Sequence, residues 1–244
     1  MKLSRHQAQV DVQVARVASL GEPVRRRLYR FVTGQPAPVS REQAAAGVAV
    51  AHHIAKFHLD KLEEDGLLKV EYRRPAGRTG PGAGRPAKFY SRAEPDIAVS
   101  LPERHYDLAG RLMAEAITSS SASGAPAEQA LRAAATSTGQ RLGADVATAA
   151  GILPDQPAVV EAVCEVLEDN GYQPQAGSTL ITLANCPFHS LAEDYTELVC
   201  AMNLALLDGL LDTAGHGILR AGLDPAPGRC CVTLKLSARS ERSN

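Results

Sequence analysis

The sequence predicts an α+β fold in two domains, because its two halves differ in charge and each contains both helix and strand patterns. Of the 244 residues, 45% are hydrophobic, which is enough to fill more than one core. Residues 1–92 contain 17 lysines and arginines against 8 aspartates and glutamates, whereas residues 93–244 contain 9 against 19. A basic half joined to an acidic half indicates a polyanion-binding domain with a separate regulatory domain. Chance placement of solvated charges is the alternative.

The basic domain begins with residues 1–19, which have weak periodicity and are expected to form a mobile arm. Apolar residues at helical spacing then predict a helix over 22–32. Ser40 and Gln43 have the spacing of a capping box. A short helix is therefore expected after Ser40, closed by Gly47.

A longer helix is predicted over 51–64 and ends at Gly66. Two alternating segments, 67–73 and 87–91, follow as strands, and the glycine- and proline-rich loop between them contains three arginines and no acid. Helix, turn, helix and hairpin in this order are typical of a winged helix-turn-helix, whose second helix lies in the major groove of DNA. We therefore interpret residues 1–92 as a DNA-binding domain.

The side chains of the longer helix are expected to divide between the core and DNA. The expected core face comprises Ile54, Phe57, Leu59 and Leu62. His58 is interpreted as a buried or half-buried structural histidine. The first turn of this helix and the loop arginines are expected to meet base edges, phosphates and the minor groove. The candidate DNA contacts are Ser40, Ala51, His52, His53, Lys56, Arg73, Arg74, Arg78 and Arg85.

The acidic half divides into a linker and dimerisation segment, 93–125, and an α+β sensor and dimerisation domain, 126–244. In the first segment a helix is predicted over 103–118 and a serine-rich loop over 119–124. That helix is the expected dimer element, because operators with paired half-sites favour two-fold dimers. In the sensor domain, helices are predicted over 127–149, 154–168 and 190–214, with a break near 194–196, and strands over 172–175, 179–183 and 230–237.

The chain has five cysteines, an odd number that does not suit a disulfide framework. Its first residues lack the apolar core of a signal peptide, and no segment approaches the roughly 20 apolar residues of a membrane span. We therefore expect a cytoplasmic protein with no membrane partner, in which disulfides are rare. Cys164 is expected to lie in a helix core. Metal ligation, redox sensing and plain burial remain open for Cys186, Cys200, Cys230 and Cys231.

An enzymatic interpretation would use Cys186 as a nucleophile and His189 as its base. The adjacent Pro187, and the lack of an evident orienting acid, disfavour this interpretation. The chain is therefore not expected to be an enzyme.

Two parts of the sequence resemble known families. The segment 25–90 resembles the winged helix of ArsR-type bacterial repressors, notably in His58-Leu59-Asp60-Lys61-Leu62 followed by Gly66-Leu67-Leu68. Its end, from Gly80 to Tyr90, is similar to the wing of SufR-type iron–sulfur repressors. The acidic half also resembles the SufR-type sensor domain. The resemblance lies in Leu183-Ala184-Asn185-Cys186-Pro187, in Cys200 and in a cysteine at the start of the last strand.

The resemblance implies a homodimeric repressor that binds a double-stranded DNA operator and senses an iron–sulfur cluster of the 4Fe-4S type. The ligands would be Cys186, Cys200 and either Cys230 or Cys231, and His189 is the candidate for the fourth position, since imidazole can replace a thiolate. A zinc site would need similar residues. The other alternative is a winged-helix regulator that binds an organic small molecule and holds no metal.

Overall fold

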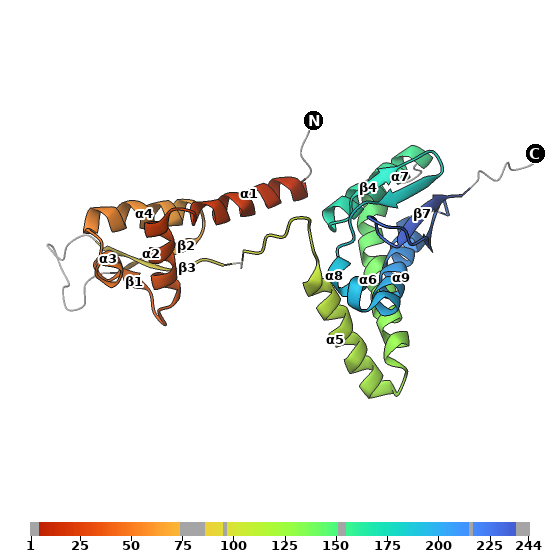
Figure 1. Cartoon of the computed structure of the whole chain (residues 1–244), viewed down its shortest axis with the longest axis horizontal. Coiled ribbons are helices and arrows are strands. Elements are labelled where there is room, and N and C mark those ends of the chain that lie inside the picture. The colour runs from red at the N-terminus through yellow and green to blue at the C-terminus, as the bar shows by residue number, and fades with distance from the viewer. Residues whose placement is uncertain (1–4, 74–85, 95–96, 151–154, 215–216, 238–244) are drawn as a thin grey trace, which may run out of the picture. The chain divides into compact units, whose positions relative to one another are not determined.

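The computed structural model describes residues 5–73, 86–94, 97–150, 155–214 and 217–237 (Figure 1). The chain divides into two compact units, one formed by Gln7–Val99 and the other by the chain from Ser100 onward. Each unit combines helices with its own antiparallel sheet, which confirms the α+β class. In the described part of the chain, no helix combines the length and the apolar character that a membrane crossing requires.

The N-terminal unit surrounds its core with helices and a small sheet. Its helices are α1 (Arg5–Ser19), α2 (Pro23–Thr33), α3 (Arg41–Val48) and α4 (His52–Glu64). Its strands, in spatial order, are β1 (Val39–Ser40), β3 (Ala87–Arg92) and β2 (Leu68–Arg73). The expected arm over 1–19 is wrong from Arg5 onward, because these residues form α1. Tertiary contact fixes the end of that helix, where the Ser19 hydroxyl donates to the Asp65 carboxylate at 2.5 Å.

Helix starts in this unit follow local chemistry. The Glu22 carboxylate accepts hydrogen bonds from the backbone N–H groups of Val24 (3.0 Å) and Arg25 (2.5 Å) at the start of α2. The predicted capping box is confirmed at the start of α3. The Ser40 hydroxyl accepts from the Gln43 N–H at 3.2 Å, and the Gln43 side chain accepts from the Ser40 N–H at 2.8 Å.

Gly47 does not close α3, contrary to the expectation from sequence. The helix runs on to Val48, and Ala49 takes the left-handed conformation at its end, with φ 55°. The glycine instead gives room to an aromatic ring, since a Cβ at position 47 would lie 2.1 Å from Cε2 of Phe31. Packing between α2 and α3, not a turn, requires glycine here.

The core face of α4 differs from the one expected. Ala55, Leu59 and Leu62 are fully buried, in agreement with a stripe at spacings of four and three residues. Ile54 and Phe57 are 37% and 65% exposed, so their assignment to the core is wrong. Each successive residue rotates about 100° around the helix axis, which turns these two positions away from the stripe that Ala55 fixes.

A network of charged and hydroxyl side chains around Asp60, which we call the charged hub, connects the sheet to the helices. The Asp60 carboxylate on α4 accepts from Arg41 of α3 at 2.8 Å, from the Tyr90 hydroxyl of β3 at 2.8 Å and from Lys88 of β3 at 3.2 Å. Burial alone would raise the pKa of Asp60, but these three donors outweigh it and lower the pKa. The ring of Tyr90 is fully buried, and burial raises the pKa of its hydroxyl to about 12.

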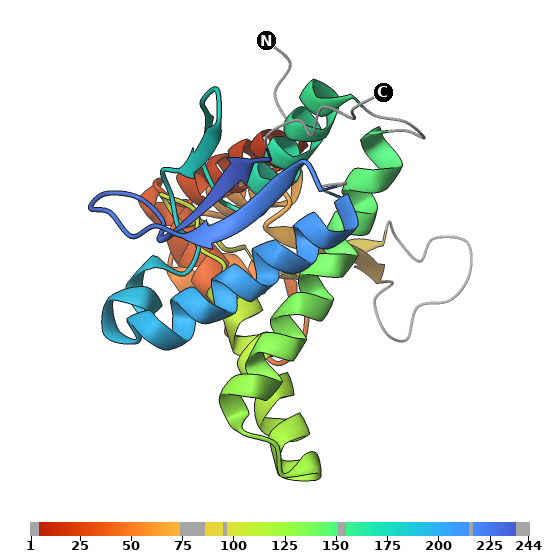
Figure 2. The same cartoon turned by 90° about the vertical axis from the view of Figure 1, so that its right-hand side faces the viewer.

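The C-terminal unit packs helices against a sheet in the order β4-β5-β7-β6. Its helices are α5 (Tyr106–Ser123), α6 (Ala127–Ala150), α7 (Gln156–Asp169), α8 (His189–Asp194) and α9 (Thr196–Ala214). Its strands are β4 (Pro174–Ala176), β5 (Leu180–Leu183), β6 (Leu219–Leu223) and β7 (Val232–Leu236). Figure 2 shows α5 and α6 as a helical hairpin and α6 crossing α9 side by side.

The α6–α9 crossing is close enough to require glycine. A Cβ at Gly139 of α6 would lie 1.9 Å from the carbonyl oxygen of Leu206 on α9. A Cβ at Gly209 of α9 would lie 2.3 Å from the carbonyl oxygen of Thr136 on α6. Neither oxygen can move without displacing a helix, so the two backbones are in direct contact.

Three expectations about this unit are corrected. The serine-rich segment 119–124 is not a loop, because α5 continues through Ser123, whose hydroxyl donates to the Ser119 carbonyl at 2.8 Å. The final strand begins at Val232, so the cysteines at 230 and 231 precede it. Strand β6 was not expected and pairs with β7. The expected break between α8 and α9 is confirmed at Tyr195.

Candidate thiol cluster and DNA-binding surface

Four cysteines from three segments meet in the C-terminal unit. Cys186 follows β5, Cys200 lies in the second turn of α9, and Cys230 and Cys231 precede β7. The thiol of Cys230 lies close enough to the thiols of Cys186 and Cys231 for each to shift the pKa of the other, and Cys200 similarly raises the pKa of Cys231. A backbone bond from the Cys230 N–H to the Leu183 carbonyl, 2.8 Å long, joins two of these segments. We call these four residues the thiol cluster.

Cys230 is the electron-rich member of the thiol cluster. Its pKa is lowered, first because the Cys186 thiol donates to its sulfur and second because the Cys231 thiol does so. The Asn203 amide adds a hydrogen bond to the same sulfur at 3.2 Å. The pKa values of Cys186 and Cys231 are raised, first by their hydrogen bonds to Cys230 and then by burial. Deprotonation is therefore favoured at Cys230, because several donors converge there.

A buried polar chain supports this sulfur. The Tyr172 hydroxyl donates to Oδ1 of Asn203 at 2.5 Å, which orients the Asn203 amide so that it can donate to Cys230. Tyr172 and Asn203 are 3% and 1% exposed. Burial first, and then the neighbouring Cys230, raise the pKa of Tyr172 well above its ordinary value, so its hydroxyl keeps the proton that it donates. Sequence analysis missed both residues, since neither lies in a cysteine motif.

The loop that carries Cys186 is held by its neighbour Asn185. The Asn185 amide donates to the carbonyl oxygens of Gly171 at 2.6 Å and Glu103 at 3.0 Å. The Arg104 guanidinium donates to the Asn185 side chain and to the Cys186 carbonyl, the latter at 3.3 Å. The segment just before α5 is thereby connected to the thiol cluster.

The structure does not bring His189 to the thiol cluster. Its side chain is 55% exposed at the start of α8 and pairs with Glu193 at 3.3 Å, and Cys231 is the fourth residue among the thiols instead. Cys164 lies apart in α7, half-buried, and burial first and Glu168 second raise its pKa to about 11. Among the described residues, no group of three or more histidine, cysteine, aspartate and glutamate side chains is arranged to hold a metal ion.

The start of α4 presents polar side chains to solvent, two in its first turn and one in its second. His52, His53 and Lys56 are exposed, as is Ala51, whose backbone caps the helix. These residues are therefore accessible, and their contact with DNA stays a prediction. Ser40 is less available, because its hydroxyl caps α3.

The predicted wing contacts are only partly described. Arg73 pairs with Glu71 and stacks over the ring of Phe89, with its guanidinium carbon 5.2 Å from the ring centre. Arg74, Arg78 and Arg85 lie outside the described residues. His58 is largely buried, as expected, and its Nδ1 lies 3.4 Å from the Glu22 carboxylate.

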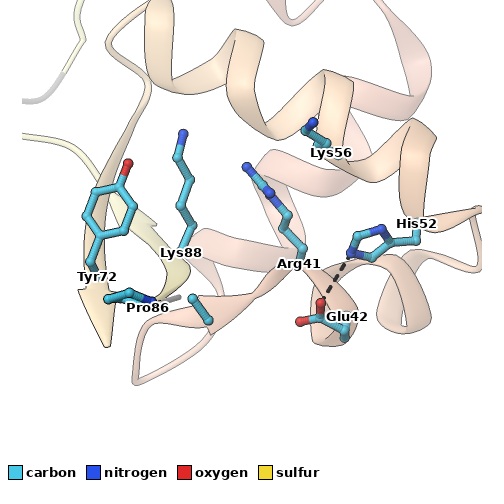
Figure 3. Close-up of a pocket in the computed structure, with 8 residues that line it drawn as sticks. Arg41, Glu42, His52, Lys56, Tyr72, Pro86 and Lys88 are labelled. Atoms are coloured by element: carbon cyan, nitrogen blue, oxygen red, sulfur yellow. Dashed lines mark hydrogen bonds and ion pairs between the residues drawn. The ribbon is translucent and has the colours of Figure 1, made fainter. Parts of the chain in front are cut away.

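A cavity of about 330 Å³ separates the first turn of α4 from the base of the wing (Figure 3). Its wall is mostly cationic and polar, and the hydrogen bond between His52 and Glu42 forms one side of it. Sequence analysis did not single out the members of this wall that come from α3 and the strands. The lining residues are Arg41, Glu42, His52, Lys56, Tyr72, Pro86, Ala87 and Lys88.

Comparison with known proteins decides the nature of the N-terminal unit. Residues 20–71, which span α2 to β2, match the family model described as a helix-turn-helix domain. The N-terminal unit is a helix-turn-helix domain. No curated protein and no solved structure matches the chain.

The match covers α3 and α4, the helix pair that the sequence predicts as the helix-turn-helix. The chain is accordingly a DNA-binding transcriptional regulator. The match ends before the C-terminal unit, so the role of the thiol cluster depends on its own chemistry.

Proposed function

We propose that the protein is a homodimeric repressor that senses iron–sulfur status through the thiol cluster. One observation carries this proposal: four cysteines that are distant in sequence, at 186, 200, 230 and 231, converge on one another in the C-terminal unit. Four thiols form a soft donor set, which suits iron–sulfur clusters and zinc.

The fit to an iron–sulfur cluster is one of donor chemistry and proximity. Among the described residues the thiols lie near one another, but no three of them are arranged to hold a metal ion. Cys186, Cys200, Cys230 and Cys231 would hold the cluster, which supplies a crosslink sensitive to iron and to oxidants. Asn203 supports this role, since hydrogen bonds to sulfur tune such centres.

Hydrogen bonds inside the C-terminal unit connect the loop of Cys186 to the segment before α5. The carbonyl of Cys186 accepts from Arg104, and the Pro187 carbonyl accepts from the His105 N–H at 3.0 Å. A change in the Cys186 loop therefore moves the start of α5. We propose α5 as the dimer element, since Ile117 on it is 62% exposed.

The test is purification of the full chain without oxygen, followed by visible absorption spectroscopy and counts of iron and sulfide. We expect a coloured protein, and we expect Cys→Ser at each of 186, 200, 230 and 231 to remove colour and iron. Cys164→Ser is the matched control. The pKa of Cys164 is raised by burial and by Glu168, and no other cysteine contributes to that change, so Cys164 lies apart from the thiol cluster. DNA binding and oligomeric state are measured with and without the bound iron.

Three outcomes would overturn the iron–sulfur proposal. Colourless protein with bound zinc would assign the thiols to zinc, and metal-free protein whose DNA binding responds to an organic molecule would favour the alternative regulator. Loss of iron in Cys164→Ser to the same extent as in the other four variants would show that the iron is not held by the thiol cluster.

A further inference from the structure

A carboxylate and an imidazole are paired where α4 begins. Nε2 of His52, the first residue of α4, lies 3.2 Å from Oε1 of Glu42 on α3 (Figure 3). We infer that Glu42 sets the tautomer of His52, so that His52 reads a DNA base by accepting a hydrogen bond from an exocyclic amino group. This inference rests on the proposed binding of DNA by α4 and names the base chemistry that α4 recognises.

The direction of the hydrogen bond follows from the charge of Glu42. Its pKa is lowered, first because its own backbone N–H donates to the carboxylate and second because the Ser40 hydroxyl does so. An ionised carboxylate only accepts hydrogen bonds, so the ring nitrogen that faces it must carry the hydrogen. Nε2 of His52 is thereby fixed as the N–H.

The other ring nitrogen then has a defined role. A neutral imidazole carries one N–H and one lone pair, so Nδ1 of His52 is an acceptor. Figure 3 shows this nitrogen pointing away from Glu42, on the side of the cavity where Lys56 lies. In the major groove the exocyclic amino groups of cytosine and adenine donate, whereas guanine O6 and N7 and thymine O4 accept. The acceptor at Nδ1 therefore favours cytosine or adenine.

The position of the pair suits base recognition. Residues in the first turn of a recognition helix meet base edges, and His52 is the first helical residue. Lys56, one turn further along, is exposed and suits a phosphate contact. The Arg41 side chain in the same cavity is engaged by Asp60 and Tyr90, and Lys88 by Asp60 and Glu63. Arg41 and Lys88 are thus occupied by other protein groups. The His52–Glu42 pair presents Nδ1 of His52 to a base as a hydrogen-bond acceptor.

The experiment selects binding sequences from a random double-stranded DNA library with the full wild-type chain at about pH 8, where imidazole is ordinarily neutral. Affinities for the selected duplex and its single-base variants are then measured by fluorescence anisotropy. We expect one base pair at which cytosine or adenine is preferred by about fivefold. His52→Ala should abolish that preference, and Glu42→Ala should abolish it while His52 is still present.

Glu64→Ala is the matched control, because it also removes one exposed negative charge from the unit but lies at the far end of α4. It should keep the base preference. A preference that survives in His52→Ala would show that Glu42 itself contacts the base, and one that survives in Glu42→Ala would show that the pair does not set the tautomer. Either result overturns the inference, whereas a wild-type chain that binds no duplex would overturn the proposed function.

Discussion

The two units of the molecule are fastened by different kinds of contact. In the N-terminal unit, charged and hydroxyl groups around Asp60 connect α3, α4 and β3. In the C-terminal unit, α6 and α9 are in backbone contact at Gly139 and Gly209, and the buried polar groups include the thiols, the Asn203 amide and the Tyr172 hydroxyl. The difference indicates that a partly buried ionic network adds to the apolar core of the N-terminal unit, whereas close backbone packing distinguishes the C-terminal unit, which also holds the thiol cluster.

The largest effect is expected from a substitution that disrupts the packing of α6 against α9. Gly139→Ala places a methyl group 1.9 Å from the Leu206 carbonyl oxygen, and the helices must separate to accept it. We expect the free energy of unfolding of the C-terminal unit to fall by about 3 kcal/mol. Urea unfolding followed by hydrogen-exchange mass spectrometry would assign the loss to this unit.

Gly110→Ala on α5 is the control for that experiment, because a Cβ there meets nothing within 4 Å. It should raise the free energy of unfolding by about 0.5 kcal/mol, since alanine restricts the unfolded chain. Equal losses in both variants would contradict the close crossing of α6 and α9.

The next largest effect is expected from a substitution that removes the ionic contacts around Asp60 in the N-terminal unit. Asp60→Ala leaves Arg41, Lys88 and the Tyr90 hydroxyl without their shared acceptor. The carboxylate is 30% exposed, so solvent reduces the loss, and we expect about 2 kcal/mol in the N-terminal unit. Hydrogen exchange of β3 and α4 would measure it, and the C-terminal unit should keep its protection.

The same hub predicts a dependence on acid. The pKa of Asp60 is lower in the folded chain than in the unfolded chain, where an aspartate has a pKa of about 3.9. Its contribution is complete above the unfolded value and is lost as the pH falls through the folded value. Below about pH 4 the wild type should therefore approach the stability of Asp60→Asn. A constant difference between the two proteins across this range would contradict the charged hub.

A smaller effect sharpens the description of the thiol cluster. Tyr172→Phe removes the donor to Oδ1 of Asn203 and leaves a buried acceptor unpaired. We expect a loss of about 1 kcal/mol from the C-terminal unit. The freed amide should also lose its fixed orientation toward Cys230, which peptide mapping after brief alkylation would show as altered labelling of Cys230 relative to Cys164. Unchanged stability and labelling would show that Tyr172 does not support the thiol cluster.

Local chemistry explains which parts of the fold could be predicted from sequence. The capping box at Ser40 and Gln43 and the break before Thr196 depend on neighbours in the chain, and both were predicted. Gly47 was misassigned because its reason lies in the ring of Phe31, which is 16 positions earlier. The serine run to Ser123 was misassigned as a loop, although the Ser123 hydroxyl donates to the Ser119 carbonyl one turn earlier in the same helix.

The same distinction applies to the candidate sites. The cysteines could be named from their residue type, but their mutual contacts, and the exclusion of His189, depend on how β5, α9 and the segment before β7 pack. Asn203 and Tyr172 carry no motif and became visible only through their bonds to Cys230 and to each other. Glu42 likewise gains its role from His52, ten positions later and on another helix.

The smallest expected effect tests the corrected core face of α4. Phe57 is 65% exposed and its ring lies edge-on to His58 with centres 5.1 Å apart, whereas Leu59 is fully buried. Phe57→Ser should therefore change the free energy of unfolding by less than about 0.5 kcal/mol, because little apolar surface returns to water. Leu59→Ala, measured in the same way, should cost about 3 kcal/mol, since it opens a cavity in the core. Comparable losses in the two variants would mean that Phe57 is covered in solution, and the sequence-based core face would then be right at this position.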